Sequence, residues 1–133
     1  MFVVNKSKEN IFFIALYVVL CLLITTFGVC GGNLLEKYYQ EIWCDEHQGK
    51  VEVVLKDGTR CDCLTSEYSV EFDFGKKWAE SLGQSLFYSI LTKNKAGIVL
   101  ILKSPRDEKF VKRLQLVIET YKLPVTVWTM KGY

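Results

Sequence analysis

Residues 50–74 read KVEVVLKDGTRCDCLTSEYSVEFDF, and they contain three short segments in which apolar and polar side chains alternate. The alternation over 50–56 is typical of a β-strand with one solvated face. Asp57-Gly58 is a strong signal for a tight hairpin turn, so residues 59–65 are expected to form the return strand. Residues 69–74 alternate again, and the three strands together predict a meander.

The segments on both sides of the meander show helical and strand patterns in turn. Apolar side chains recur at helical spacing once before it and twice after it, and two further runs have strand character. In chain order we expect a helix at 33–44, the three strands, a helix at 76–91, a strand at 97–102, a helix at 105–121 and a strand at 125–130. The later strand–helix–strand order predicts a parallel crossover. The sequence therefore predicts an α/β fold with a mixed central sheet flanked by helices, in the order αβββαβαβ.

The apolar stripes of the first two helices predict which side each turns toward the sheet. In the first helix the stripe consists of Leu35, Tyr38 or Tyr39, Ile42 and Trp43. In the second it consists of Trp78, Leu82, Leu86 and Ile90. We expect these side chains to face the core.

Length and composition bound the architecture. The chain has 133 residues, of which 50% are hydrophobic and 24% charged, so it suits one domain and is too apolar for a disordered chain. Its 5 cysteines are too few for a disulfide-scaffold miniprotein. A formal net charge of +2 gives no argument from total charge for binding to nucleic acid or to a membrane.

The first 32 residues differ in character from the rest. Residues 11–27 carry no charge, Lys6 and Lys8 precede them and glycines follow, which is the pattern of a secretory signal. The run is near the short limit of a membrane span. We therefore expect 1–32 to be a cleaved signal peptide or a hydrophobic helix kept as an anchor, and 33–133 to be the folded domain. Either version predicts an exported, periplasmic protein or one anchored to the inner membrane through 11–27; a buried core helix and lipidation at Cys30 are the alternatives.

Acidic side chains gather on one face of the predicted meander. Glu71 and Asp73 are two residues apart on one strand, so their side chains project to the same side, and Asp62 lies on the neighbouring strand. Such carboxylates are costly to bury unless they are solvated or share a cation, and oxygen ligands of this kind suit Mg²⁺ or Mn²⁺. The pattern indicates either a metal site or the polar side of a half-exposed sheet.

Three polar side chains follow on the next predicted helix. Lys77 stands at its start, and Gln84 and Tyr88 are four residues apart on one helical face. They are candidates to complete a site with the carboxylates. The alternative is that Lys77 is a surface lysine and that the other two pack along the helix.

The chain resembles the PD-(D/E)XK, or restriction-endonuclease-like, nuclease superfamily in element order and in three motifs. Residues 58–62 are similar to the lead-in to the family's metal-binding aspartate, and Glu71-Phe72-Asp73 falls at its (D/E)-x-K motif. Residues 84–88 match the Q-x-x-x-Y motif of the RecB-like branch, and 77–84 resemble uncharacterised bacterial members with N-terminal signal-like segments. The resemblance covers 33–133, and its motifs are confined to 58–88.

The resemblance implies a metal-dependent nuclease that hydrolyses phosphodiester bonds of nucleic acid, with DNA as the expected substrate. In this reading the metal-binding residues are Asp62, Glu71 and Asp73, and the ion is Mg²⁺ or Mn²⁺. A carboxylate of the first helix, Glu36 or Glu41, is expected to complete the metal shell. The other expected site residues are Lys77, which orients the attacking water, and Gln84 and Tyr88, which support the site or contact the DNA backbone.

One position departs from the family pattern. The family's lysine falls at position 73, where this chain has Asp73. Lys77, or less favourably Lys76, is expected to supply the ammonium group from the start of the helix instead. If neither does, the resemblance implies a catalytically degenerate module that binds nucleic acid or a protein partner without cleaving it.

The remaining cysteine, histidine and basic residues leave alternatives open. Cys44, Cys61 and Cys63 lack zinc-ligand spacing; buried free thiols are favoured, and a Cys44–Cys63 disulfide is the alternative in an exported protein. His47 is the single histidine, which argues against a histidine-based site. A basic run forms either a solvated face or a track for phosphates; it consists of Lys93, Lys95, Lys103, Arg106, Lys109, Lys112 and Arg113.

Overall fold

The computed structural model describes residues 31–132, with side chains from Glu36 onward. Its helices are α2 (Gly31–Glu46), α3 (Trp78–Thr92) and α4 (Glu108–Tyr121), and its strands are β1 (Lys50–Val54), β2 (Arg60–Leu64), β3 (Tyr68–Phe74), β4 (Lys95–Leu102) and β5 (Val125–Lys131). Two short 3₁₀ turns, η1 (Gly75–Lys77) and η2 (Pro105–Asp107), lead into α3 and α4. The predicted order αβββαβαβ is confirmed.

The predictions for the N-terminal segment concern residues outside this range. The apolar run 11–27 and Cys30 lie outside the described residues, and so do the expected cleavage, anchoring and lipidation. Between residues 31 and 132, no helix has the length and apolar character needed to cross a membrane.

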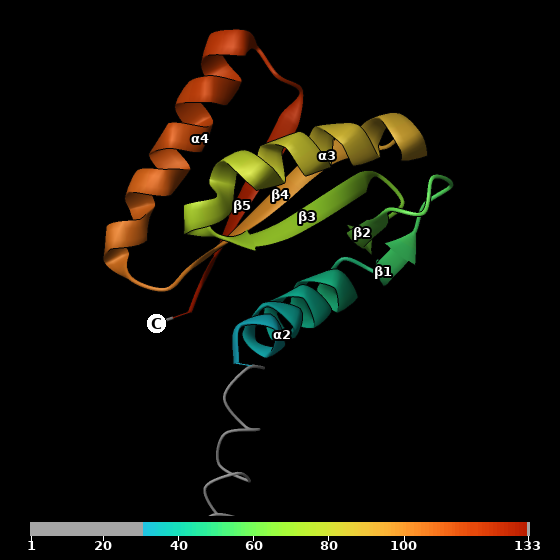
Figure 1. Cartoon of the computed structure of the whole chain (residues 1–133), viewed down its shortest axis with the longest axis horizontal. Coiled ribbons are helices and arrows are strands. Elements are labelled where there is room, and N and C mark those ends of the chain that lie inside the picture. The colour runs from blue at the N-terminus through green and yellow to red at the C-terminus, as the bar shows by residue number, and fades with distance from the viewer. Residues whose placement is uncertain (1–30, 133) are drawn as a thin grey trace, which may run out of the picture. The chain divides into compact units, whose positions relative to one another are not determined.

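The five strands form one mixed sheet in the order β1-β2-β3-β4-β5 (Figure 1). The first three pair antiparallel as a meander, whereas β3, β4 and β5 run parallel. Helices α3 and α4 provide the two crossovers between the parallel strands, as the spacing of the elements predicts. The expected α/β fold with a mixed sheet is therefore confirmed.

Helices cover both faces of the sheet (Figure 1). On one face, α2 packs Trp43 and Cys44 against Val70 and Phe72 of β3. On the other face, α3 and α4 pack against the alternate side chains of β4, including the fully buried Leu100. Because the middle of β3 is buried on both faces, the charged side chains of Glu71 and Asp73 are removed from solvent.

The hairpin predicted at Asp57-Gly58 is confirmed. Gly58 has a φ of +86°, which glycine adopts without strain, and its N–H donates to the carbonyl of Leu55 at 3.0 Å. The Asp57 carboxylate accepts bonds from the backbone N–H and the hydroxyl of Thr59. These contacts fix the register with which β2 returns along β1.

The expected alternation of β1 is only partly correct. Val51 was expected on the buried side, but 40% of it is exposed, and the strand ends at Val54. Glu52 has a left-handed backbone with a φ of 56°. That conformation interrupts the pleat of an edge strand, so the side chains before and after it no longer alternate between two faces.

The expected helix faces also need correction. In α2 the buried side chains are Gln40, Trp43 and Cys44, whereas Tyr38 is 59% and Ile42 is 36% exposed. In α3 the buried side chains are Ser81, Ser85 and Tyr88, while Trp78 and Leu82 are partly buried and Ile90 is 74% exposed. In both helices, contacts with the centre of the sheet set the rotation, and these contacts include polar side chains.

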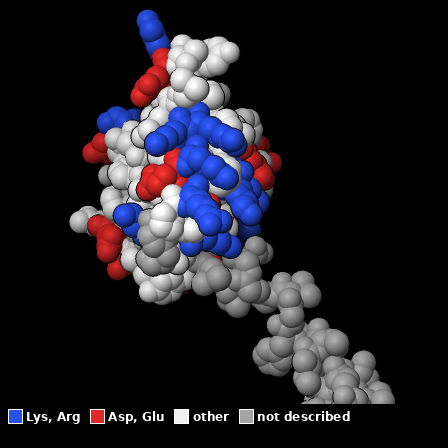
Figure 2. All heavy atoms as spheres, turned by 90° about the vertical axis from the view of Figure 1, so that its left-hand side faces the viewer, with Lys and Arg blue, Asp and Glu red and all other residues white. Residues whose placement is uncertain are grey.

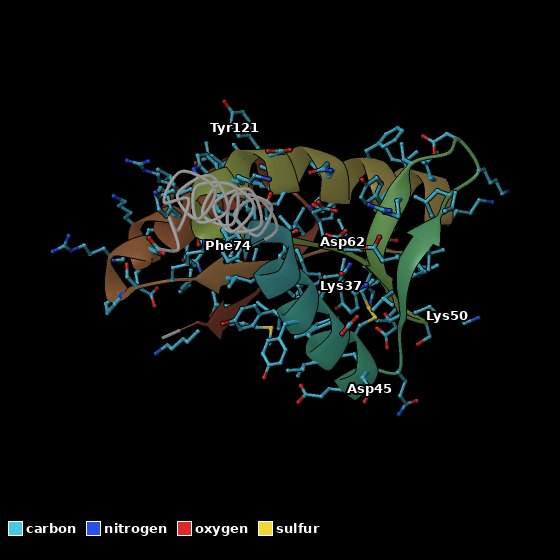
Figure 3. The ribbon with its side chains drawn as sticks, turned by 60° about the horizontal axis from the view of Figure 1, so that its bottom comes forward. Lys37, Asp45, Lys50, Asp62, Phe74 and Tyr121 are labelled. Atoms are coloured by element: carbon cyan, nitrogen blue, oxygen red, sulfur yellow. A yellow bond between two sulfur atoms is a disulfide. The ribbon has the colours of Figure 1, made fainter. Side chains whose placement is uncertain are left out.

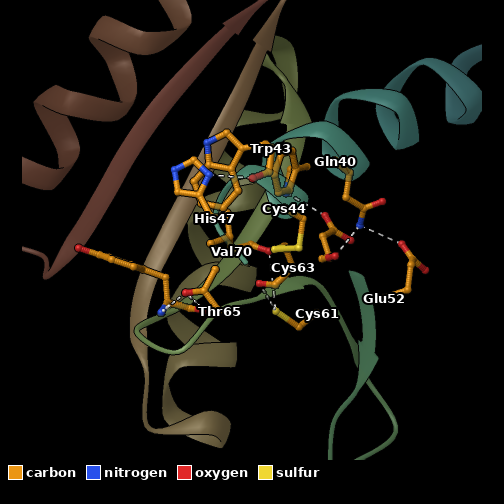
Figure 4. The surroundings of a disulfide bond; sticks show 12 residues. Gln40, Trp43, Cys44, His47, Glu52, Cys61, Cys63, Thr65 and Val70 are labelled. Carbon is orange, nitrogen blue, oxygen red and sulfur yellow. Dashed lines mark hydrogen bonds between the residues drawn. A yellow bond between two sulfur atoms is a disulfide. The ribbon is translucent and has the colours of Figure 1, made fainter. Parts of the chain in front are cut away.

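A disulfide bond joins Cys44 of α2 to Cys63 of β2 (Figure 4). The favoured expectation of free thiols is therefore wrong for these two residues and correct for Cys61, which is buried and unpaired with another sulfur. Gly49 lies beside the bridge, where an added Cβ atom would stand 2.6 Å from both sulfur atoms. The bridge fastens the last turn of α2 to the meander.

Candidate functional site

The strands β2 and β3 separate at Asp62. Their ladder holds Cys63 opposite Val70 and Leu64 opposite Ser69. One residue further, the Asp62 carboxylate accepts the backbone N–H of Phe72 at 2.8 Å. A side chain thus takes the place of the backbone partner, and the carboxylate of Asp62 is held against β3.

Glu71 and Asp73 project from β3 on the face that α3 covers. They are buried, with 5% and 3% of their surface exposed. The alternative that they form the polar side of a half-exposed sheet is therefore wrong. Glu71 Oε2 is buried without a hydrogen-bond partner among the described residues, which is unusual for a buried polar atom. Asp73 Oδ1 accepts the N–H of Phe74 at 2.9 Å.

Burial and mutual repulsion act on these three carboxylates in the same direction. Burial, followed by the charges of Asp62 and Asp73, raises the pKa of Glu71 to about 9. Burial also raises the pKa of Asp62 to about 6, although the N–H of Phe72 acts in the opposite sense. The pKa of Asp73 rises to about 6 through burial, against the attraction of Lys77. A group of carboxylates in this state has a strong preference for a nearby cation.

Lys77 approaches the carboxylates from η1. Its Nζ lies 3.5 Å from Asp73 Oδ1, and its side chain is 57% exposed. The Asp73 charge raises the pKa of Lys77, so the group is an ammonium ion. Lys76 instead lines a cleft with Phe74 and Lys103. The structure therefore brings Lys77, and not Lys76, to the predicted site.

The helix α3 places Gln84 and Tyr88 together, as their spacing predicts. Gln84 Nε2 donates to the Tyr88 hydroxyl at 3.3 Å. Tyr88 is 5% exposed; burial raises its pKa, and the charges of Glu71 and Asp62 add to this effect. Tyr88 therefore interacts electrostatically with both carboxylates, and the Gln84–Tyr88 pair lies near the acidic group.

The helix α2 contributes Glu36 and not Glu41. Burial raises the pKa of Glu36, and Asp62 adds to the shift. Glu36 also raises the pKa values of Glu71 and Asp73. Glu41 forms an exposed pair with Lys37 at 3.7 Å. Of the two glutamates, Glu36 is therefore the one that interacts with the acidic group.

Two residues near Asp62 were missed by the sequence analysis. Gln40 is 4% exposed, and its amide donates to the Asp62 carbonyl at 2.8 Å and to Glu52 Oε1 at 3.0 Å (Figure 4). Glu52 Oε2 also pairs with Arg60 at 2.7 Å. The sequence did contain a signal for Gln40. It lies four residues after Glu36 and three before Trp43, so the three side chains share one face of the helix.

His47 lies in a different environment, at the end of α2. Its ring stacks on Trp43 with the centroids 3.6 Å apart, and Nδ1 lies 2.7 Å from the Trp43 carbonyl oxygen. Tyr68 and Trp128 form the neighbouring wall of a small pocket there. Packing against these aromatic rings accounts for the position of His47.

The carboxylates around Asp62 and Glu71 are the possible ligands for a divalent cation. Within residues 31–132, no three Asp, Glu, His or Cys side chains are grouped so that they could hold a metal ion. Mg²⁺, however, commonly uses one or two carboxylates and completes its shell with water and substrate phosphates. Asp62 and the unpartnered oxygen of Glu71 match that smaller set, whereas Asp73 is engaged by Lys77. The residues present fit Mg²⁺ or Mn²⁺ with few protein ligands.

Comparison with models of protein families, with curated proteins and with solved structures finds nothing that matches this chain.

Proposed function

We propose that this chain is a metal-dependent nuclease with a restriction-endonuclease-like core that hydrolyses phosphodiester bonds, with DNA as the first substrate to test. The element order supports this reading, because α2, the meander, α3 and β4 follow the predicted αβββαβ order. The motif residues support it too. Asp62 holds the N–H of Phe72, next to Glu71 on β3, and Gln84 donates to Tyr88, whose pKa is raised in part by the charges of Glu71 and Asp62. The proposal covers residues 33–133.

One observation carries the proposal: the buried carboxylates of Glu71 and Asp73 and the half-buried carboxylate of Asp62 act on one another electrostatically, and Lys77 pairs with Asp73. Buried carboxylates with raised pKa values and one orphaned oxygen are costly to the fold. Such a cost is typical of functional sites. A bound divalent cation would supply a Lewis acid and lower the pKa of water. Asp62 and Glu71 would hold it, and Glu36 would lie at its edge.

The other side chains have separate roles in the proposed hydrolysis. Water attacks phosphorus, the bond to one ester oxygen breaks, and that oxygen leaves with a proton. Lys77, held by Asp73, orients the water or stabilises the negative charge that develops on the phosphate. Gln84 and Tyr88, which are hydrogen-bonded to each other, support the site or contact the DNA backbone.

We further propose that the protein works outside the cytoplasm, either exported or anchored by residues 11–27. The Cys44–Cys63 disulfide supports this location, because disulfides persist mainly in oxidising compartments. Labelling of the native chain with a membrane-impermeant reagent tests it.

A cleavage assay tests the activity. The full chain, purified in detergent, is incubated with plasmid, linear duplex and single-stranded DNA in Mg²⁺, Mn²⁺ or EDTA. We expect metal-dependent cleavage that disappears in Glu71→Gln and persists in Glu41→Gln, which removes one exposed carboxylate of the same type. Cleavage that survives Glu71→Gln, or none from the folded wild type, would contradict the proposal.

A second candidate function is a module that binds nucleic acid or a protein without cleaving it. It is favoured by Asp73, which occupies the position of the family's lysine and pairs with Lys77 at 3.5 Å. An ammonium group held in that pair has fewer donors left for water. Duplex binding without cleavage in any metal would select this candidate.

A further inference from the structure

Six basic side chains of η1, η2, α4 and the loop after β4 form what we call the cationic face. They are Lys76, Lys103, Arg106, Lys109, Lys112 and Arg113. Figure 2 looks at the side of the molecule formed by α4 and shows lysine and arginine side chains gathered there. Two members of the predicted basic run do not belong to it: Lys93 and Lys95 lie at the opposite end of β4. Lys95 pairs with Glu67.

The charges of the cationic face are not neutralised within the described part of the chain. None of its six members forms an ion pair with a carboxylate between residues 36 and 132. Lys103 Nζ lies 3.8 Å from the centre of the Phe74 ring, and Lys109 lies over Phe110. Asp107 lies among them and offsets one of the six positive charges, while its Oδ2 accepts the backbone N–H of Lys103. The face therefore presents a net positive charge to solvent.

The cationic face borders the candidate site at the carboxyl ends of two parallel strands. Lys76 follows β3 and Lys103 follows β4, and both line a cleft of about 230 Å³ with Ser104. In parallel sheets ligands bind outside the carboxyl ends of the strands. Lys76 is adjacent in sequence to Lys77, which pairs with Asp73 of the acidic group. A phosphate chain that follows the cationic face would thus pass the exposed ammonium group of Lys77.

We infer that the cationic face binds duplex nucleic acid through its phosphates, without reading bases. Arginine and lysine side chains on a helix supply phosphate contacts that carry no sequence information. This inference rests on the proposed function for its choice of partner.

The shortage of exposed aromatic rings favours a duplex over a single strand. Proteins that bind single strands stack bases on aromatic side chains. The exposed aromatic residues of the described part of the chain are Tyr38 on α2, Phe87 on α3 and Tyr121 at the far end of α4. Phe110 is buried, and Phe74 lies beneath Lys103. Stacking surfaces are therefore absent from the cationic face as described.

Fluorescence anisotropy with a labelled 20-base-pair DNA duplex tests the inference in Ca²⁺ or EDTA, so that binding is separated from cleavage. The variant Lys109→Gln/Lys112→Gln/Arg113→Gln removes three charges of the face. The matched control Lys37→Gln/Lys50→Gln/Lys56→Gln removes three exposed charges from α2 and the β1 hairpin; Figure 3 labels two of these lysines. All chains are used full-length.

We expect the first variant to weaken duplex binding about tenfold or more, and the salt dependence to become shallower by about one for each lost phosphate contact. The control should bind like the wild type, and a single strand of the same length should bind more weakly. Equal losses in both variants, tighter binding of the single strand or no duplex binding by the wild type would overturn the inference. The inference would also be overturned if the first variant lost binding to phosphatidylglycerol vesicles but kept duplex binding. That result would assign the face to membranes.

The outcomes separate this inference from the proposed function. If duplex binding depends on the cationic face but no metal supports cleavage, the binding surface is supported and the nuclease activity is rejected. Metal-dependent cleavage with unchanged binding in the first variant rejects the surface and leaves the nuclease. The variant Glu41→Gln should bind the duplex as the wild type does, because Glu41 lies on α2, outside the cationic face.

Discussion

The Asp62 carboxylate accepts the backbone N–H of Phe72 at 2.8 Å, and this bond begins where the backbone ladder between β2 and β3 ends. One side chain therefore has two tasks. It completes the hydrogen bonding of a central strand, and it presents a second oxygen beside Glu71. The two tasks can be separated by substitution.

Asp62→Asn should keep the hydrogen bond to the Phe72 N–H and remove the negative charge beside Glu71. The asparagine carbonyl can still accept the Phe72 N–H, so we expect a folded protein with no metal-dependent cleavage. Asp62→Ala leaves that buried N–H without a partner and should lower the free energy of unfolding by about 1–3 kcal/mol. Urea denaturation of both variants checks the difference. An alanine variant as stable as the asparagine variant would show that the bond is unimportant for folding.

Stability should fall as the pH rises, because the carboxyl pKa values are raised. The folded-state values are about 6 for Asp62 and about 9 for Glu71, above the ordinary 3.8 and 4.5. At pH below about 3 these carboxyls are protonated in both the folded and the unfolded chain, and the penalty is absent. Between about pH 3 and the folded-state pKa values, the unfolded chain ionises more easily than the folded chain, so stability falls. We expect the free energy of unfolding to be a few kcal/mol lower at pH 9 than at pH 5. Glu71→Gln should flatten this dependence, and a flat wild-type profile would refute the prediction.

Mg²⁺ should stabilise the folded protein at pH 7.5. A ligand that binds only the folded state adds about 2.7 kcal/mol when its concentration is one hundred times Kd. We expect a rise in Tm on adding Mg²⁺ that EDTA reverses and that Glu71→Gln abolishes. Glu41→Gln should respond like the wild type. Equal rises in both variants would indicate binding elsewhere.

Lys77→Ala should reduce the cleavage rate more than it reduces binding. An ammonium group that stabilises developing charge contributes about 10²-fold, so we expect a loss of that order in single-turnover rate at saturating protein. Lys76→Ala, on the cationic face, should change the affinity for DNA and leave that saturated rate unchanged. The reverse pattern would identify Lys76 as the catalytic ammonium.

Loss of the disulfide should destabilise the whole domain. The bridge joins residues 19 apart in sequence, and a loop of this length gives about 3 kcal/mol in the chain-entropy model. We expect the variant Cys44→Ser/Cys63→Ser, and the reduced wild type, to unfold at lower urea concentrations. Cys61→Ala serves as the control, because it removes a thiol and leaves the bridge. Equal stability of the oxidised and reduced chains would contradict the expected gain.

Local patterns predicted the elements, the hairpin and the common face of Glu71 and Asp73, because each depends on the period of one segment. The rotation of α2 was not predictable in this way. Its aromatic residues suggested one face, but the bridge at Cys44 and the bond from Gln40 to Asp62 fix another. Those contacts join residues about twenty apart, so no local period contains them. The choice of Glu36 over Glu41 depended on the same rotation.

The residues tolerated at position 49 depend on whether Cys44 and Cys63 form a disulfide. A Cβ atom there would stand 2.6 Å from the sulfur atoms of both Cys44 and Cys63 while these are joined, whereas two separate thiols could turn aside. Alanine at position 49 should therefore be tolerated where the cysteines stay reduced and rejected where they pair. A survey of permitted residues at this position, made in two cellular compartments, would report where the chain matures without any isolation of the protein.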